Sequence, residues 1–429
     1  MESYLLDWSN LLLRWLHVIT AIAWVGSSFY FVFLDSSLTP PNDERMKRDG
    51  VTGELWAVHG GGFYHPVKYN VSPPKLPDHL VHGGGVYHAQ KYMVAPKGGI
   101  DSHLHWFYWE SYWTWMSGFA LFVVLYLWNA GIYLVSPSNP LMPPSMAIVA
   151  ALAFLVVFWL LYDGICRVFG QKDKGDAIVG ALVLVLVCIA AWLACHIFPG
   201  QAAFLLMGAM LATSMSANVF FWIIPGQRKV VAALKAGQPV DPIHGKRGKQ
   251  RSVHNTYFTL PVLFAMLSNH YGWLYNHPRN WLVLILMMFA GAAIRQFFVM
   301  RHGFKLGRNA HPWPYAAVGV VVLLGVLGWL RPAPQAAVAA QAGAAPAAAG
   351  YEQLHAVMQK HCVVCHSAST VAQKNVKFDT PEEVKGHAQQ IYQQVVQLRK
   401  MPFGNPGALT DEERDTFKRW YEGGAPVAP

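Results

Sequence analysis

The chain alternates long apolar stretches with short polar segments over its first three quarters. A helix rises about 1.5 Å per residue, so each stretch can cross, or nearly cross, the ~30 Å hydrocarbon core of a bilayer. The pattern therefore predicts an all-α fold in which a polytopic bundle of about eight helices spans a membrane. The expected spans are residues 11–34, 115–135, 146–162, 178–198, 203–224, 258–273, 281–300 and 315–330.

Positive charges are distributed unevenly among the loops that join these stretches. Lys and Arg gather after the third, fifth and seventh stretches, whereas the loops between them hold almost none. Basic loops stay in the cytoplasm, so the even number of spans places both termini on the outer side. By the same parity, we expect the long segment 35–112 in the cytoplasm.

Composition agrees with a membrane location. Of the 429 residues, 54% are hydrophobic and only 13% are charged, which is typical of an integral membrane protein and excludes a soluble one. The net charge of +10 matters less than its placement in the loops. The expected environment is a lipid membrane, and no nucleic-acid partner is expected.

A C-x-x-C-H motif near the C-terminus carries the most specific chemistry of the chain. Cys362 and Cys365 have the spacing at which two thiols bond to the vinyl groups of one haem, and His366 is placed to bind its iron. A zinc site would need a second ligand pair, and a redox dithiol would need a βαβ context. The remaining cysteines lie far upstream in apolar stretches. The motif therefore predicts one covalent haem c and one-electron transfer.

The motif belongs to a compact C-terminal unit, residues 351–429. An Ala- and Pro-rich linker, residues 331–350, separates this unit from a membrane domain formed by residues 1–330. We expect a short helix before the motif and a last helix that begins at a capping box formed by Thr410 and Glu413. This unit resembles the small, single-haem class I cytochromes c, which are all-α.

The second axial ligand of the haem iron should follow the motif. Met401 lies where such cytochromes carry their methionine, and a thioether ligand raises the haem potential. Met358 and His387 are the competitors, but we expect Met358 in the core and His387 in solvent. In bacteria, haem is attached to such motifs on the outer side of the inner membrane. This agrees with the termini and the cytochrome unit being periplasmic.

Five histidines fall within or beside the expected spans, where ionisable residues are costly and usually functional. Each could also be an ordinary core histidine. Together they suggest one or more b-type haems held between helices. The segment 15–26 also resembles the first helix of the membrane-bound, haem-containing protoporphyrinogen oxidases, which carries a functional histidine at the matching place. The candidates are His17, His196 and His270 toward the outer side, and His254 and His302 toward the cytoplasm.

Two polar residues, Arg295 and Gln296, interrupt the seventh expected span. Arg295 lies close enough to the cytoplasmic end to extend its charged group to the membrane surface. It could equally bind an anion, such as a haem propionate or an anionic substrate. Both interpretations remain open from the sequence.

A Val-His-Gly-Gly-Gly-x-Tyr-His unit occurs twice, at residues 58–65 and 81–88. Each copy should form a hairpin or tight turn with short strands. Its histidines, His59 and His65 in the first copy, could bind metal or haem or move protons. Alternatively, the segment is a purely structural cap over the helix bundle. An aromatic segment at the membrane boundary follows and contains Glu110, a candidate proton acceptor.

Three segments and the haem motif resemble the bacterial membrane-bound urate oxidase (urate hydroxylase) family over nearly the whole chain. The segments are residues 56–65, 105–112 and 254–261. Members of that family join an N-terminal multi-span domain to a C-terminal cytochrome c. One His-Gly-Gly-Gly unit is expected in the family, so the second copy leaves open which copy faces the site.

The resemblance implies oxidation of urate to 5-hydroxyisourate, with electrons leaving through haem to the respiratory chain rather than directly to oxygen. Urate is an anion, so its site should offer a cation, aromatic rings and a base. The candidate catalytic residues are His59, His65, Glu110 and Arg295. Because urate is cytoplasmic and haem c lies outside, we expect redox centres within the membrane. The expected acceptor is a soluble cytochrome c or a terminal oxidase.

Two other classes of protein stay open from the sequence. One is a quinol-linked electron-transfer subunit without an organic substrate of its own. The other is a metal-handling membrane protein, which the His-rich segment 35–112 suggests.

Overall fold

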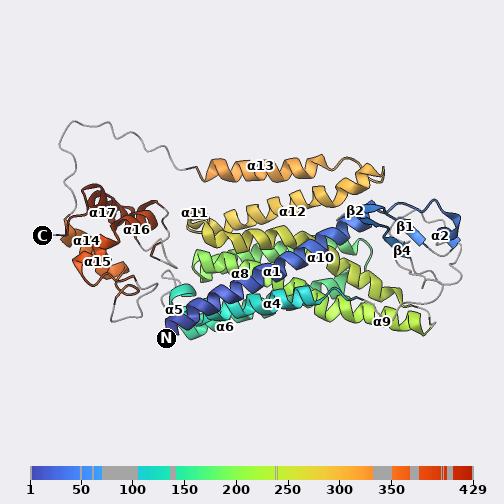
Figure 1. Ribbon diagram of the computed structural model, residues 1–429, viewed down its shortest axis with the longest axis horizontal. Helices are drawn as coiled ribbons and strands as arrows, with labels where there is room; N and C mark the ends of the chain where they lie inside the picture. The colour runs from blue at the N-terminus through green and yellow to red at the C-terminus, as the bar shows by residue number, and fades with distance from the viewer. Residues whose placement is uncertain are drawn as a thin grey trace.

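A computed structural model of the protein provides the fold (Figure 1). The description covers residues 2–48, 51–59, 62–69, 105–135, 142–236, 238, 240–331, 350–367, 376–397, 399, 401–402 and 409–427. The second His-Gly-Gly-Gly copy and nearly all of the expected linker lie outside these residues.

Helices occupy all or most of every predicted span, so the all-α membrane bundle is confirmed. Among the described residues, five helices are long and apolar enough to cross a membrane, and they cover Trp8–Ser37, Pro144–Phe169, Gly175–Ile197, Gly200–Lys235 and Asn280–Lys305. The helices of the bundle are α1 (Glu2–Ser37), α4 (Trp109–Phe122), α6 (Pro144–Phe169), α7 (Gly175–Ile197), α8 (Gly200–Ala217), α10 (Pro242–Leu267), α12 (Asn280–Lys305) and α13 (Trp313–Trp329).

Three of the predicted spans differ from a simple apolar helix. The second is continued after α4 by a π-helical segment, η1 (Val123–Leu127), and a short helix, α5 (Ala130–Tyr133). The sixth begins earlier than predicted, since the basic first half of α10 is also helical. The eighth, α13, is apolar but short. A hydropathy pattern therefore misses helical residues where the sequence is charged, and it does not reveal where a helix is interrupted.

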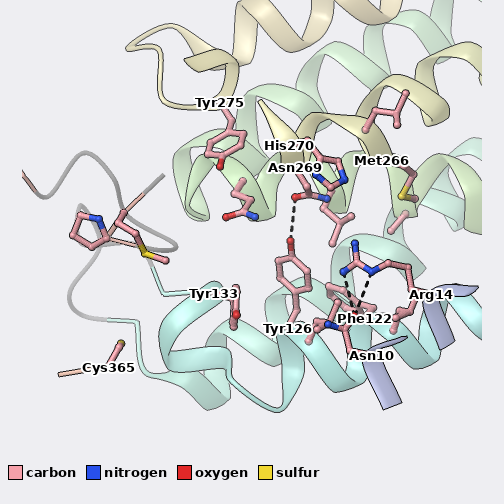
Figure 2. Close-up of a pocket in the computed structure, with 18 of the residues that line it drawn as sticks. Asn10, Arg14, Phe122, Tyr126, Tyr133, Met266, Asn269, His270, Tyr275 and Cys365 are labelled. Atoms are coloured by element: carbon pink, nitrogen blue, oxygen red, sulfur yellow. Dashed lines mark hydrogen bonds between the residues drawn. The ribbon is translucent and has the colours of Figure 1, made fainter. Parts of the chain in front are cut away.

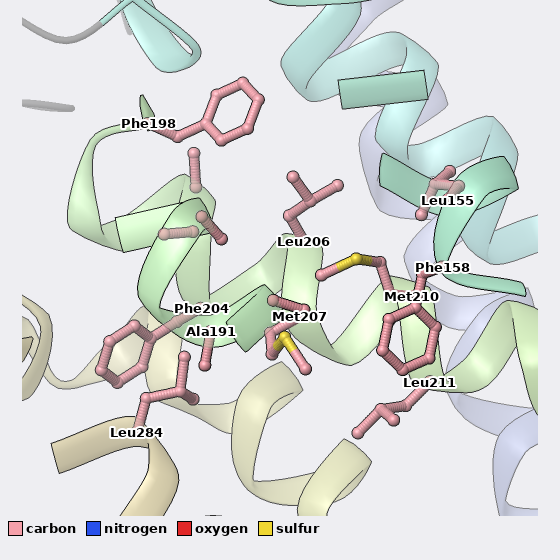
Figure 3. Close-up of a cluster of buried hydrophobic side chains, with 14 of the residues drawn as sticks. Leu155, Phe158, Ala191, Phe198, Phe204, Leu206, Met207, Met210, Leu211 and Leu284 are labelled. Atoms are coloured by element: carbon pink, nitrogen blue, oxygen red, sulfur yellow. The ribbon is translucent and has the colours of Figure 1, made fainter. Parts of the chain in front are cut away.

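The core of the bundle surrounds α8, which packs against α4, α6, α7 and α10. Phe204, Leu206 and Met207 on α8 are fully buried. Figure 3 shows them beside Phe158 of α6 and Leu284 of α12. A π-helical segment, η2 (Asn218–Ile223), extends α8 and leads into α9 (Ile224–Lys235). Helix α8 is therefore the central helix, and the surrounding helices of the bundle pack against it.

Short strands form two hairpin-like pairs beyond the end of α1. A short helix, α2 (Glu44–Arg48), precedes them. β1 (Val51–Glu54) pairs antiparallel with β4 (Val67–Tyr69), and β2 (Ala57–His59) pairs antiparallel with β3 (Gly62–Tyr64). The inner pair is the first His-Gly-Gly-Gly copy, so the predicted hairpin is confirmed for that copy.

The C-terminal unit has a hydrophobic cluster of its own. Its helices are α14 (Tyr351–His361), α15 (Pro381–Gly386), α16 (Ala388–Ile391) and α17 (Asp411–Glu422), with a π-helical segment, η5 (Tyr392–Gln397), after α16. The predicted capping box is present: Thr410 Oγ1 accepts from the Glu413 backbone, and Glu413 Oε2 accepts from the Thr410 backbone. Phe417 and Trp420 of α17 are fully buried.

The two ends of the bundle carry different structures (Figure 1). The N-terminus and the C-terminal unit lie at one end, whereas the β1–β4 strands lie at the other. An even number of spans requires this arrangement. Below, the first is called the cytochrome-side end and the second the strand-side end.

Candidate functional site

The C-x-x-C-H motif forms a tight turn directly after α14. The backbone N–H groups of Cys365 and His366 both donate to the carbonyl oxygen of Cys362, at 3.1 and 3.0 Å. All three residues line one cavity of about 820 Å³. Both cysteines are free thiols, and burial raises the pKa of Cys362 to about 12. The turn thus brings both thiols and the histidine to one cavity, as the predicted haem attachment requires.

His366 is held in place by one hydrogen bond and one ring contact. Its Nδ1 donates to the carbonyl oxygen of Val376 at 3.0 Å, and its ring packs 4.8 Å from the Phe378 ring. A hydrogen bond at one ring nitrogen fixes the tautomer and leaves the other nitrogen as a ligand. The side chain therefore fits the predicted role of a proximal haem ligand.

Met401 lines the same cavity as His366. Its backbone N–H donates to Gln394, and its carbonyl accepts from the buried guanidinium of Arg414 at 3.4 Å. Arg414 also donates to the Val395 carbonyl at 2.5 Å, so one buried cation holds two chain segments beside the cavity. Sequence reasoning missed Arg414; an arginine on the otherwise apolar face of the last helix was the available signal.

The two competitors of Met401 also line the cavity. Met358 is 1% exposed and belongs to the core, as predicted. His387 is half-buried rather than solvated, since it caps two short helices and its Nδ1 bonds Gln390 at 2.9 Å. The role of Met401 as the second axial ligand remains a prediction.

The same cavity reaches the membrane domain at the cytochrome-side end (Figure 2). Arg14, Tyr126 and His270 line it opposite Cys365. Tyr126 donates to the side-chain oxygen of Asn269 at 3.2 Å, which ties the second span to the end of α10. Polar and charged groups thus line one continuous space that the haem motif faces.

His17 lines this cavity from α1. Its Nδ1 lies 3.0 Å from the Thr114 carbonyl and 3.1 Å from Ser117 Oγ, both on α4. Gly118 makes room for the ring, because a Cβ there would lie 2.8 Å from His17 Cε1. The ring is therefore fixed at Nδ1 and packs directly against the backbone of α4 at Gly118.

The other histidines suggested for haem b lie elsewhere. His196 is exposed and bonds the Trp192 carbonyl of its own helix at 2.7 Å. His254 bonds the Tyr162 hydroxyl at 2.8 Å, and His302 packs 5.0 Å from the Phe33 ring. Of the five candidates, the structure brings only His17 and His270 into the cavity that the haem motif lines.

The four candidate catalytic residues are not assembled into one cluster in the described part of the chain. His59 is exposed on β2, and Glu110 lies in the first turn of α4. His65 bonds Glu54 at 2.7 Å and stacks on Trp56 at 4.1 Å.

Arg295, the fourth of these residues, is a buried cation on α12. It is 5% exposed, and its Nε and Nη2 atoms have no hydrogen-bond partner among the residues that the structure describes. Its guanidinium lies 3.8 Å from the centre of the Phe29 ring on α1. The next residue, Gln296, accepts a hydrogen bond from the Tyr257 hydroxyl. An unsatisfied buried guanidinium is costly, and an anion is the partner that would satisfy it.

A buried polar network near the strand-side end was missed by the sequence reasoning. Arg251 donates to Asp163 at 2.6 Å and to Asn218 at 3.3 Å. Asn218 donates in turn to the Tyr162 hydroxyl and to Asn255, each at 2.9 Å. Isolated Asp and Asn residues within or beside apolar stretches were the signal that could have revealed it.

No cluster that resembles a multi-ligand metal site occurs among the described residues: no three His, Cys, Asp or Glu side chains are grouped to hold an ion. The metal-handling interpretation therefore finds no support there.

Comparison with known proteins identifies the family. A family model described as Urate oxidase N-terminal matches residues 3–81 and 79–330. The two matches meet where the second His-Gly-Gly-Gly copy begins. No curated protein and no solved structure matches the chain. The family matches cover well over half of the sequence, and so the chain belongs to the urate oxidase N-terminal family.

Proposed function

We propose that this protein oxidises urate to 5-hydroxyisourate and passes the electrons through haem to the respiratory chain rather than directly to oxygen. Family membership supports a urate-directed oxidoreductase, and the apolar helices support a multi-pass membrane protein. The main support for a cytochrome-linked reaction is the cavity that the C-terminal unit and the membrane domain share. Cys362, Cys365, His366 and Met401 line the same space as His17 and His270.

The C-terminal unit fits a covalent haem c. Cys362 and Cys365 would form the thioether bonds, with His366 and Met401 on the two sides of the iron. The bound group would supply one-electron transfer. The protein supplies a fixed proximal histidine, an apolar wall around Phe378 and the buried Arg414 that holds the backbone of Met401.

A second haem, of the b type, is proposed between His17 and His270. His17 is fixed at Nδ1, which leaves Nε2 for a metal, and Arg14 lines the same cavity one helical turn away. A guanidinium at that position suits a haem propionate. The His17→Leu variant should lose a b-type absorption band, whereas His196→Leu should retain it. Equal spectra of the two variants would contradict this assignment.

We place urate binding at Arg295. Urate oxidation consumes one water and releases two protons and two electrons, so its site needs an anion partner and a base. Arg295 offers two unpaired nitrogen donors, and Phe29 offers an aromatic face beside them. His65 and Glu110 remain the candidate bases. Both lie toward the strand-side end, with His65 among the strands and Glu110 at the start of α4.

The cellular setting follows from the same proposal. The strand-side end would face the cytoplasm of a bacterial cell, since the basic loops belong there. The cytochrome-side end would then be periplasmic, where a soluble cytochrome c or a terminal oxidase can accept electrons.

Anaerobic reduction tests the proposal. Urate is added to the oxidised, detergent-purified full chain under argon, and the visible haem bands are followed. Reduction of both b-type and c-type bands is the expected result. An active protein with only haem c would contradict the intramembrane relay. No reduction by urate, with reduction by a quinol analogue, would assign the chain instead to the quinol-linked electron-transfer subunits.

A further inference from the structure

A second cavity, of about 240 Å³, lies within the bundle between α7, α8, α10 and α12. Its walls are almost entirely apolar. Leu184 and Phe289 line it and are 49% and 40% exposed on the outer surface of the bundle. In a membrane-spanning bundle, such a surface faces lipid, so the cavity is accessible to a lipid-soluble molecule.

His254 is the basic side chain that lines this cavity. Its Nδ1 is engaged by the Tyr162 hydroxyl at 2.8 Å, whereas no hydrogen bond involves its Nε2 in the described part of the chain. An apolar cavity with a single fixed imidazole is suited to a ligand that is mostly apolar and accepts one hydrogen bond.

Hydrogen bonds connect His254 to the aqueous surface. The path runs from Tyr162 to Asn218 at 2.9 Å, then to Arg251 at 3.3 Å and to Asp163 at 2.6 Å. Asp163 also pairs with Arg167, whose side chain is 60% exposed. The buried network of the strand-side end therefore fixes the orientation of the ring that borders the cavity.

The cavity is adjacent to Arg295. Ala292, which lines the cavity, precedes Arg295 by three residues on α12, or about 4.5 Å along the helix axis. Tyr257 also lines the cavity, and its hydroxyl bonds Gln296 next to Arg295. A ligand in the cavity would thus lie about one helical turn from the proposed urate site.

We propose that the cavity beside His254 binds a lipid-soluble quinone, which accepts electrons from urate. The volume equals about eight water molecules at ~30 Å³ each, enough for one substituted ring and too small for a haem. The apolar walls disfavour urate itself. This inference rests on the proposed urate oxidation.

The reaction balances without a further reactant. Urate, water and quinone give 5-hydroxyisourate and quinol. Two electrons leave urate and reduce the quinone ring, and the two protons released from urate and water are matched by the two that the quinone oxygens take up. His254 would donate a hydrogen bond to one quinone oxygen, and the Tyr162 hydroxyl would hold the ring in that orientation.

Photo-crosslinking tests the binding site without using urate. An azido-ubiquinone analogue is added to the haem-loaded full chain in liposomes. The sample is irradiated, and the labelled peptides are identified. Labelling of α7, α10 or α12 is expected. Gly180→Phe adds a ring at the cavity wall and should reduce labelling about tenfold or more. Gly325→Phe is the matched control, because that glycine is exposed on α13, away from the cavity. Labelling that is equal in both variants would overturn the site.

Urate-driven reduction of decylubiquinone tests the redox step. In the unaltered protein, urate should reduce the quinone under argon, and Gly180→Phe and His254→Leu should each slow this about tenfold or more while haem reduction by urate continues. Reduction of haem but not of quinone by urate would overturn this inference and leave the proposed function intact. If urate reduced neither haem nor quinone, both proposals would fall.

Discussion

The proposed urate site depends on one residue, Arg295, a buried cation of helix α12. Its guanidinium is buried among apolar helices and stacks on Phe29, with two nitrogen atoms unsatisfied. A group of this kind lowers stability when its site is empty and gains a strong partner when an anion binds. By contrast, the buried Asp163 and Arg251 neutralise each other. Arg295 is therefore the residue at which stability and function should respond in opposite directions.

Replacing Arg295 by Met should abolish most urate turnover without lowering the melting temperature. Loss of a buried charge partner costs on the order of 2–5 kcal/mol of binding, which corresponds to a decrease of roughly thirtyfold to a few thousandfold in kcat/KM. Arg301→Met is the matched control, since Arg301 is exposed on the same helix. Steady-state kinetics and thermal unfolding measure the two effects. Normal turnover of Arg295→Met, or its unfolding at a lower temperature, would contradict the assignment.

Substituting Met401 by Leu should lower the midpoint potential of haem c by on the order of 100 mV, because a thioether ligand favours the reduced iron. Met358→Leu changes another methionine of the same cavity but conserves volume within the core, so its potential should match the unaltered protein. Spectroscopic redox titration distinguishes the two. A lower midpoint potential in Met358→Leu, with an unchanged potential in Met401→Leu, would indicate that Met358 is the axial ligand instead.

Contacts between elements position the proposed haems. Helices α1 and α4 meet where His17 lies against Gly118, and helices α14 and α17 meet where Glu413 accepts from Lys360 at 3.0 Å and bonds His361 at 3.2 Å. The first contact depends on the absence of a side chain at Gly118, and the second depends on an ion pair between Glu413 and the exposed Lys360. Each can be altered by one conservative substitution.

The Gly118→Ala variant should displace the His17 ring, since the added Cβ would lie only 2.8 Å from it. We expect loss or shift of the b-type band with an unchanged c-type band. Gly131→Ala is the control, because its Cβ would meet Pro144 at an ordinary 3.6 Å. Low-temperature absorption spectra measure both. An unaltered b-type band in Gly118→Ala would count against His17 as a ligand.

Glu413 makes the stability of the C-terminal unit depend on pH. Its hydrogen bond with the Thr410 backbone, aided by Lys360 and His361, lowers the pKa of this carboxyl from 4.5 to about 2. The stabilisation is complete above about pH 4.5, where the unfolded-state carboxyl is also ionised, and it is lost as pH falls toward about 2.

Acid unfolding of the haem-loaded full chain, followed by far-UV circular dichroism, should therefore show a smaller loss of stability between pH 4.5 and about 2 in Glu413→Gln. Glu412→Gln, the exposed neighbour, is the control. Identical acid profiles for Glu413→Gln and the unaltered protein would refute the role of the capping box in this pH dependence.

Some elements were predictable from sequence and others were not. Apolar stretches locate the spans because burial in lipid demands continuous hydrophobicity. The basic first half of α10 and the π-helical η2 escaped prediction, since both depend on the tertiary network around Asp163 and Arg251. The C-x-x-C-H motif is local in sequence, so it could be recognised there. The cavity that His17 and His270 share is formed by distant helices and could not be predicted.

At the scale of the whole molecule, the C-terminal unit and the β-strands lie at opposite ends of the bundle. The N-terminus and the C-terminal unit share one end, and the strands occupy the other (Figure 1). The even number of predicted spans already placed both termini at one end of the bundle. The site at Arg295 is thereby separated from the haem motif by much of the bundle, and the cavity lined by His17, His270 and Cys365 shortens that path. The proposed export of electrons through haem would use this separation of the two ends.

The stoichiometry of electron export tests this account most directly. The full chain is supplied with urate and excess oxidised soluble cytochrome c under argon, and in a parallel sample hydrogen peroxide is measured in air. We predict two cytochrome c molecules reduced for each urate consumed, and no peroxide. One peroxide formed for each urate in air, with cytochrome c left oxidised under argon, would contradict the central claim.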